Sequence, residues 1–400
     1  MNQTALAGVK VMEYCQMVCG PYCAKLLADL GAEVIKVEKP VTGDQARSRG
    51  PFLHDIPHPE RSGLFLYLNT NKYGVTLDPA SSAGKVIFLE LVKWADVLIE
   101  DTAPGTMEHL GLGYDSLKEV NPSLVMTSIT PFGQTGPYRD YKAHHLNIYH
   151  ASGQASFSFT QKHGEDTTPV KGGGYVGDYD AGLSGAVATL AALYKRGPGG
   201  TGQHIDVSRQ ETLISLDRVD ISASANDPNA TARRRGMLGG LMPCKDGYVM
   251  VIAPQQHQWE ALVELLGNPE WAHSEKCKDE WTRSDNAAEL QPLIEEWMLR
   301  YNKDEIYHRG QSFGCPVAPV NSAADVYNSP QVKHREFFAE IEHPEAGKLS
   351  YPTAPYRLSE TPWRANRAAP LLGEHNDSVY RKRLGRSEEE MAKLKEQGII

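Results

Sequence analysis

The sequence predicts an α/β protein with a doubly wound, Rossmann-like large domain and a smaller α+β domain. Two observations support this fold class. Through the first third of the chain, short apolar runs of strand length alternate with helical patterns, which is typical of parallel strands joined by crossover helices. The chain also has 400 residues with 40% hydrophobic and 23% charged side chains, an ordinary globular composition with room for two or three domains.

Five apolar runs near the N-terminus are expected to form strands, and a sixth strand is expected later in the chain. They lie at residues 9–14, 34–38, 75–77, 97–100, 125–129 and 202–207. The turn after the first run reads YCQMVCGPY and lacks the GxGxxG pattern of dinucleotide-binding folds. A nicotinamide dinucleotide cofactor is therefore not expected.

The ends of the helices are predicted from capping residues and glycines. Pro21 suits the first turn of the first helix, and Gly31 suits the position just past its end. Ser81 or Ser82 can cap a helix that runs to Trp94. Further helices are expected near residues 106–110, 115–120, 179–196 and 210–223, and a capping box at Ser387-x-x-Glu390 begins the last one.

The polar, basic segment 227–235 is interpreted as a linker from the large domain into the small one. The predicted domains are residues 1–226, 227–325 and 326–400, the last being a return segment whose C-terminal helices pack on the large domain. The expected elements of the small domain are a strand at 247–253 and helices at 257–266 and 288–300.

Charge and cysteine content exclude several functional classes. Lys and Arg total 41 against 50 Asp and Glu, a net charge of −9, so no dominant basic surface for nucleic acid or acidic membranes is expected. The six cysteines include no CxxC pair, and Cys15, Cys19 and Cys23 are predicted to be small buried hydrophobes. With neither a secretory signal nor an apolar run of about 20 residues, the protein is expected to be soluble and cytoplasmic.

The segment VKGGGYVGDYDAG carries the most suggestive residues. The glycines at 172–174 allow close approach of a ligand, and Gly177 presents Asp178 at the start of a strongly predicted helix. First-turn N–H groups favour an ionised carboxylate there, and such a carboxylate beside a glycine-lined cavity is suited to attack an activated acyl group. A simple helix N-cap is the alternative for Asp178. Asp180 is a rival, but it points to a different face of the helix.

Motifs along nearly the whole chain resemble those of family III CoA-transferases, the group that includes formyl-CoA transferase and carnitine CoA-transferase, with α-methylacyl-CoA racemase as a relative. In chain order they are LAGVKVMEY, CGPYCAKLLADLGAEVIKVEKPVTGD, NTNKYGVTLD, ADVLIED, PGTMEHLGLGYDSLKEVNPSLVMTSITPFGQTGPY, GDYDAG, TGQHIDVS, CPVAPV and APLLGEH. A single motif would be weak support, but this many in family order is strong.

The resemblance implies that the chemistry takes place on Asp178. In the family the aspartate of a G-D-x-x-x-G motif is the nucleophile, and here Gly177 precedes Asp178 and Gly182 follows four residues later. The implied reaction moves CoA from an acyl-CoA thioester to a carboxylic acid through an aspartyl anhydride and an aspartyl-CoA thioester. Each step conserves acyl activation, so coenzyme A and acyl-CoA are substrates, and neither a tightly bound cofactor nor a metal is expected.

Coenzyme A is anionic, and the resemblance implies that basic residues bind it. Lys142 matches a CoA-contacting lysine of the family, and Lys39 lies where relatives often carry a basic residue. Arg47, Asp101 and His109 complete the candidate CoA-binding set, with His109 at a position that is arginine in formyl-CoA transferases. A solvated surface position is the alternative for an isolated cation.

Gly239 and Gly240 are candidates for oxyanion stabilisation, because similar enzymes cover the site with a mobile glycine-rich loop. The corresponding segment here reads RRRGMLGGLMPCKDG. A flexible turn before the strand at 247–253 is the alternative.

The residues at positions 144 and 145, both histidine, are also compatible with a second activity. Formyl-CoA transferases have Tyr-Glu at these positions, where the glutamate assists catalysis, and the racemases have His-Asp, where the histidine acts as a base. His144 thus resembles the racemase base, while His145 replaces an acidic partner. The alternative function is racemisation or epimerisation of 2-methylacyl-CoA with His144 and Asp178 as the acid/base pair. A structural role is the alternative for the two histidines.

The resemblance also implies an interlocked homodimer, in which each chain threads through a hole in the other. The expected partners are an acyl-CoA donor and a carboxylic acid acceptor, with no nucleic acid and no membrane. The identity of the acid stays open, because the chain departs from familiar members around residues 144–150 and 236–242.

Overall fold

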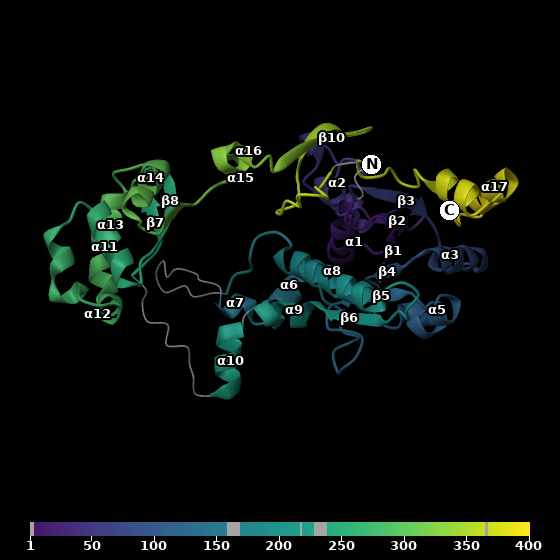
Figure 1. Ribbon diagram of the computed structural model, residues 1–400, viewed down its shortest axis with the longest axis horizontal. Helices are drawn as coiled ribbons and strands as arrows, with labels where there is room; N and C mark the ends of the chain where they lie inside the picture. The colour runs from purple at the N-terminus through teal and green to yellow at the C-terminus, as the bar shows by residue number, and fades with distance from the viewer. Residues whose placement is uncertain (1–3, 158–168, 217, 228–237, 365–366) are drawn as a thin grey trace. The chain divides into compact units, whose positions relative to one another are not determined.

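The computed structural model describes residues 4–157, 169–216, 218–227, 238–364 and 367–400. The described residues form two compact units, shown in Figure 1. Of the described residues, 4–157, 169–216, 218, 336–364 and 367–400 belong to the first unit, and 219–227 and 238–335 belong to the second. Most of the linker predicted at 227–235 lies outside the described residues.

The first unit is built on a six-stranded parallel sheet in the order β3-β2-β1-β4-β5-β6. Its strands are β1 (Lys10–Tyr14), β2 (Glu33–Glu38), β3 (Lys72–Thr76), β4 (Val97–Glu100), β5 (Val125–Thr130) and β6 (His204–Ser208). Because successive strands are added outward from β1 on one side and from β4 on the other, the order reverses between these two strands. The prediction of a parallel α/β sheet is confirmed, although β3 begins three residues before the predicted run.

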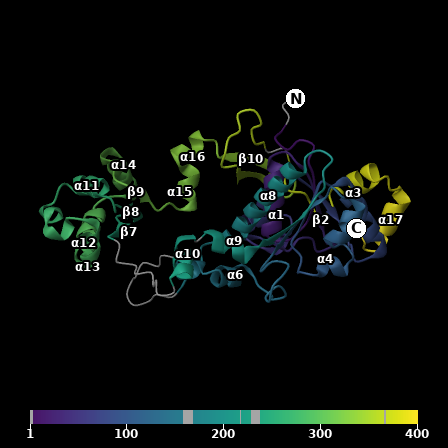
Figure 2. The same ribbon diagram turned by 60° about the horizontal axis from the view of Figure 1, so that its bottom comes forward.

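Helices cover both faces of this sheet (Figures 1 and 2). On one face, α1 (Cys19–Asp29) and α8 (Val176–Arg196) pack on a core that includes Val11, Val34 and Val97. On the other face the covering helices are α3 (Ser82–Trp94), α5 (Tyr114–Val120), the π-helical turn η5 (Asp377–Arg383) and α17 (Glu388–Glu396). Burial of apolar side chains on both faces holds the sheet between these two layers.

Several helix ends agree with the capping predictions. The Ser81 hydroxyl accepts a hydrogen bond from the Gly84 N–H (3.0 Å) at the start of α3, and Ser387 and Glu390 form the predicted capping box of α17. Gly31 follows α1 with φ +98°. The segment predicted as a helix at 210–223 is helical in α9 (Arg209–Leu216) and α10 (Arg218–Asn226), and residue 217 between them lies outside the described residues.

The remaining elements of the first unit are short. A hairpin of β10 (Phe338–His343) and β11 (Gly347–Pro352) shares a core cluster with the helix α2 (Gly63–Leu68). The others are η1 (Gln45–Ser48), η2 (Leu53–Asp55), α4 (Thr106–His109), α6 (His145–Ala151) and α7 (Gln154–Phe157).

The second unit is an α+β structure with its own apolar core around Trp259 and Ile294. Its antiparallel sheet has the order β7-β8-β9, and the predicted limits 227 and 325 both fall within the unit. Its elements are β7 (Gly239–Cys244), β8 (Gly247–Ile252), α11 (Gln256–Leu265), η3 (Glu270–His273), η4 (Glu275–Cys277), α12 (Glu280–Asp285), α13 (Ala287–Met298), α14 (Lys303–Phe313), β9 (Val317–Pro319), α15 (Ala323–Asn328) and α16 (Pro330–His334). In the described parts of the chain, every helix is too short or too polar to cross a bilayer.

Candidate active site

A cavity of about 800 Å³ lies at the carboxyl ends of the parallel strands in the first unit. This edge is where open α/β sheets bind ligands, especially where the strand order reverses, here between β1 and β4. The lining residues follow the strands in turn: 15–19 after β1, Lys39 after β2, Asp78 after β3, Asp101 after β4, Pro131 after β5 and Arg209 after β6. Residues 139–144 and Asp178 also belong to the lining.

Asp178 lies in the first turn of α8, buried to 7% exposure, and lines this cavity. Helix α8 begins at Val176, three residues earlier than predicted, so Tyr175 takes the N-cap position and the Asp178 N–H bonds to the Tyr175 carbonyl (2.9 Å). The N-cap alternative for Asp178 is therefore wrong. The carboxylate still lies near the positive end of the helix dipole, which favours its charge.

The two glycines of the G-D-x-x-x-G motif let α8 pack closely on its neighbours. A Cβ atom at Gly182 would lie 2.6 Å from the backbone oxygen of Cys19 in α1, and one at Gly177 would lie 2.8 Å from a methyl group of Leu213 in α9. Glycine at these positions thus allows the close approach that brings Asp178 to the cavity.

Arg209 forms an ion pair with Asp178 and is the site residue that the sequence analysis missed. It is the first residue of α9, directly after β6, and its side chain is 12% exposed. Burial opposes the guanidinium charge, but Cys19 and Asp178 raise the pKa of Arg209 above its usual value. The signal that could have found it is a basic residue immediately after the last parallel strand, at the edge where such sheets bind ligands.

The three closely spaced cysteines are buried free thiols, as predicted. Cys19 is the first residue of α1 and lines the cavity with Asp178. Burial, followed by the Asp178 carboxylate, raises the pKa of the Cys19 thiol well above its usual value, so the thiol is uncharged at neutral pH.

His144 and His145 lie in different surroundings although they are adjacent. His144 is exposed, lines the cavity and precedes α6, where its N–H donates to Asn147 Oδ1 (3.0 Å). The His145 ring instead packs edge-on against Tyr175, with centroids 4.9 Å apart, and His145 is not a lining residue. Burial lowers the pKa of His145, partly opposed by Asp178, so its ring is neutral at pH 7.

Three of the five candidate CoA-binding residues line the cavity. Lys39 and Lys142 are exposed at its wall. Asp101 is partly buried and accepts hydrogen bonds from the Gln16 N–H at 2.9 and 3.2 Å, and burial raises the pKa of its carboxyl well above the usual value. His109, at the end of α4, is exposed and does not belong to the lining.

The geometry argues against Arg47 as a CoA contact. Its guanidinium is buried over the Phe65 ring, with Nε and Nη2 donating to Glu38 at 2.7 and 2.8 Å. Nη1 donates to Glu60 (2.5 Å), and Nη2 also reaches the Pro370 carbonyl (3.0 Å). All three guanidinium nitrogens are thus held by protein acceptors, which makes Arg47 a structural residue.

Gly239 and Gly240 lie in a strand rather than in the expected loop. Both are buried in β7, where they pair with Ile252 and Val251 of β8, and the Gly239 N–H donates to Gln291 Oε1 (3.1 Å). Residues 233–237 of the same glycine-rich segment lie outside the described residues. The predicted loop placement is therefore wrong for these two glycines, because strand pairing in the second unit holds their backbone.

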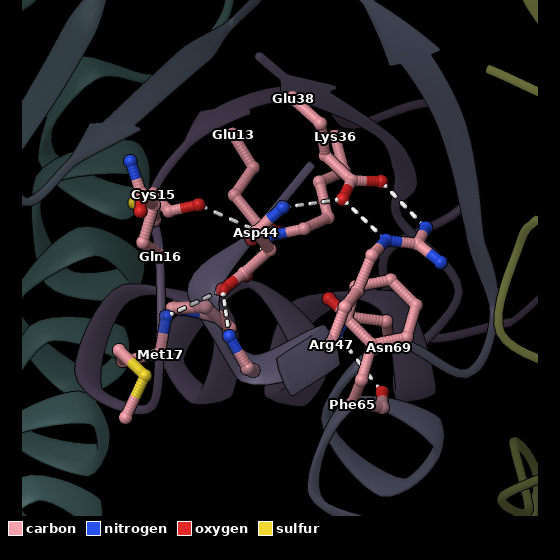
Figure 3. A network of polar contacts seen from close by, with 12 residues as sticks. Glu13, Cys15, Gln16, Met17, Lys36, Glu38, Asp44, Arg47, Phe65 and Asn69 are labelled. Atoms are coloured by element: carbon pink, nitrogen blue, oxygen red, sulfur yellow. Dashed lines mark hydrogen bonds and ion pairs between the residues drawn. The ribbon is translucent and has the colours of Figure 1, made fainter. Parts of the chain in front are cut away.

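A buried network of charges fixes the loop that follows β1 (Figure 3). Lys36 Nζ forms ion pairs with Glu13 and Asp44, both at 2.8 Å, and donates to the Cys15 carbonyl (3.1 Å). Asp44 also accepts the N–H of Met17 (2.8 Å), whose φ of +62° places it in the left-handed region. The network thus stabilises a strained loop that forms one wall of the cavity.

Comparison with known proteins identifies relatives over essentially the whole chain. The model of CoA-transferase family III matches residues 6–376. The chain is 33% identical to the formyl-CoA:oxalate CoA-transferase of Streptomyces coelicolor over all of both chains. It is 32% identical to the succinyl-CoA–L-malate CoA-transferase beta subunit of Chloroflexus aurantiacus, over 99% of this chain and 98% of that one. A CaiB/BaiF family protein from Brucella suis has a similar structure, with a TM-score of 0.83 and 30% identity over 95% of this chain and 99% of that chain.

Proposed function

The chain belongs to CoA-transferase family III and is an enzyme of this class, and on this premise we propose that it moves CoA from an acyl-CoA to a carboxylic acid with Asp178 as the nucleophile. One observation carries the proposal. Asp178 is a buried carboxylate that lines the cavity at the carboxyl edge of the sheet, and a cation, Arg209, holds it. A carboxylate in such a position can form a covalent acyl intermediate.

The first half of the reaction exchanges the acyl group for CoA on Asp178. A carboxylate oxygen of Asp178 attacks the thioester carbon, the new C–O bond forms, and the C–S bond breaks to release CoA thiolate. The thiolate then attacks the Asp178 carbonyl carbon of the mixed anhydride and expels the donor acid as its carboxylate. The product of this half is an aspartyl-CoA thioester.

The second half runs in the opposite sense with the acceptor acid. Its carboxylate attacks the aspartyl-CoA thioester, giving a second mixed anhydride and CoA thiolate. The thiolate attacks the acceptor's carbonyl carbon, forms the new acyl-CoA and restores the Asp178 carboxylate. Every step exchanges one activated acyl bond for another, so the cycle balances without ATP or a net proton.

Lys39 and Lys142 are the lining cations proposed to contact CoA. Both side chains are exposed at the wall of the cavity that contains Asp178. Their ammonium groups suit the phosphates of CoA. Replacement of either lysine by alanine should therefore raise the KM for acyl-CoA more than the KM for the acid.

The substrates to test first are those that the relatives' names contain. Formyl-CoA with oxalate and succinyl-CoA with L-malate are the two pairs so named. We propose an acyl-CoA donor and a small carboxylic acid acceptor, and a screen of these and other pairs by mass spectrometry would identify them.

The nucleophile is tested by looking for the covalent adduct. After incubation with acyl-CoA, the Asp178 peptide should carry added mass, and hydroxylamine should capture it as the hydroxamate. Asp178→Asn and Asp178→Ala should lose the adduct and at least about a thousandfold in transfer rate. Asp180→Asn, two residues along the same helix and away from the cavity lining, is the matched control and should keep both. Full transfer activity in Asp178→Ala would overturn the proposal.

The alternative activity, racemisation of 2-methylacyl-CoA, has one observation in its favour. His144 and Asp178 line the same cavity, so a base and an acid could face one substrate. Wash-in of deuterium at the α-carbon from heavy water, without exchange of CoA between acids, would favour this alternative over transfer.

A further inference from the structure

We propose that Arg209 binds the carboxylate of the acceptor acid, and that it becomes available to do so only when the Asp178 carboxylate is covalently modified, as a mixed anhydride or as the CoA thioester. This inference rests on the proposed function of Asp178 and assigns a second role at the same site. Arg209 would then be the residue that recognises the acid group common to all acceptors.

The first observation is the state of the guanidinium. Arg209 and Asp178 are 12% and 10% exposed in their side chains and form an ion pair at the wall of the cavity. None of the described residues accepts a hydrogen bond from the buried Nε of Arg209. Asp178 therefore compensates the charge of a cation that still has an unused donor.

The second step follows from the charges of the intermediates. The mixed anhydride and the aspartyl-CoA thioester both leave the Asp178 side chain uncharged. The ion pair then no longer exists, and a buried guanidinium without an anion is strongly disfavoured. A carboxylate that enters the cavity at that stage can accept bidentate, charge-assisted hydrogen bonds from the guanidinium.

The reaction itself supplies that anion. The donor acid leaves as a carboxylate from the anhydride, and the acceptor acid arrives as a carboxylate at the aspartyl-CoA thioester. In the resting enzyme the guanidinium of Arg209 is paired with Asp178, and the negative charge of Asp178 repels the carboxylate of a free acid. Binding of the acid is thus coupled to the covalent modification of Asp178, because either intermediate removes the charge of that side chain.

A binding measurement tests this coupling without turnover. In Asp178→Asn the side chain is uncharged, as in the anhydride and the CoA thioester, and Arg209 has lost its anion. Isothermal titration calorimetry with oxalate should give a dissociation constant about tenfold or more lower for Asp178→Asn than for the unmodified enzyme. The double variant Asp178→Asn/Arg209→Gln should lose this gain. Equal gains in the single and double variants would overturn the proposal, because relief of repulsion alone would then explain the binding.

A kinetic measurement separates the two substrates. Arg209→Gln should raise the KM for the acceptor acid by about tenfold or more and change the KM for acyl-CoA little, while Arg209→Lys should recover part of the loss. The matched control is Arg196→Gln, which breaks another partly buried arginine–aspartate pair (Arg196 Nη2 to Asp96 Oδ1, 3.0 Å; Arg196 14% exposed) away from the cavity lining.

The adduct on Asp178 distinguishes this inference from the proposed function. If Arg209→Gln forms the adduct from acyl-CoA and the acid KM stays within twofold of the unmodified enzyme, the role of Arg209 fails and Asp178 remains the nucleophile. A similar rise of the acid KM in Arg196→Gln would also overturn it, since a general loss of packing would then suffice. If the unmodified enzyme forms no adduct, the proposed function fails first.

Discussion

At the scale of single residues, the site depends on charges that protein groups compensate almost completely. Asp178 and Arg209 compensate each other, whereas Glu38 and Glu60 enclose Arg47. Removal of one partner of such a buried pair leaves the other uncompensated, which destabilises a protein by about 3–5 kcal/mol. This is why the activity of Arg209 variants has to be judged beside Arg196→Gln.

A buried histidine makes stability depend on pH. His343 is 1% exposed, its Nδ1 accepts the N–H groups of Glu345 (3.2 Å) and Ala346 (3.1 Å), and burial lowers its pKa. The native ring is therefore neutral. The unfolded chain takes up a proton near pH 6.5 while the native protein does so only at lower pH, so the stability that is present above about pH 6.5 is lost as pH falls.

We expect the free energy of unfolding, measured in urea, to decrease between pH 7.5 and pH 5.5. His343→Gln should show a smaller decrease, by at most about 1.4 kcal/mol for each pH unit in that window. His109→Gln, at an exposed position of the same unit, is the control and should behave like the unmodified protein. Identical pH dependence in all three proteins would contradict the assignment of a neutral native His343.

At the scale of elements, the packing of α8 on α1 decides where the nucleophile lies. Helix α8 carries Asp178 in its first turn, and one turn later Gly182 contacts the backbone of Cys19 in α1. A side chain at position 182 would meet a carbonyl oxygen that cannot rotate away. The distance between the two helices, and with it the position of Asp178, therefore depends on that glycine.

Gly182→Ala should lower stability by about 1–3 kcal/mol through overpacking. Its transfer rate should fall further, by up to about a hundredfold, because a shift of α8 misplaces the nucleophile. Thermal denaturation and steady-state transfer assays measure the two effects. Lys195→Ala, at an exposed position of the same helix and off its apolar face, is the control and should change stability by less than about 0.5 kcal/mol. Unchanged stability and an unchanged transfer rate in Gly182→Ala would contradict this prediction, because α1 could then move to accept the methyl group without displacing Asp178.

At the scale of the whole molecule, α8 presents an apolar face that this chain leaves exposed. Leu183, Val187 and Tyr194 are 49%, 60% and 92% exposed, and together with Val176 they follow the helical period along one side. Such a continuous apolar face in a stable protein is typical of a protein–protein contact. It supports the homodimer that the family resemblance implies, which remains a prediction.

Sedimentation equilibrium should therefore give the mass of a dimer, twice 44.1 kDa. Val187→Glu should shift the equilibrium toward monomer, because it places a charge within the apolar face. Lys195→Ala, an exposed residue off this face, should sediment like the unmodified protein. A monodisperse monomer for the unmodified chain would exclude both the dimer and its interlocked form.

The sequence by itself determined the parallel sheet, the capped helices and the placement of Asp178 beside a helix N-terminus. These features depend on local signals: apolar runs of strand length, serine caps, and glycines next to one aspartate. The sequence did not predict the early start of β3 because Lys72 is polar. In the fold Lys72 is buried and its Nζ forms an ion pair with Glu13 (2.7 Å).

Only the tertiary structure decided which charged residues serve the site. Arg47 and Arg209 belong to no charged motif in the sequence. In the structure, Glu38, Glu60 and a carbonyl 323 residues away enclose Arg47, whereas Arg209 reaches Asp178. Likewise, Gly239 and Gly240 become strand residues because β8 pairs with them. The partners of a charge or of a backbone N–H come from distant parts of the chain, so residue type and neighbouring sequence do not specify them.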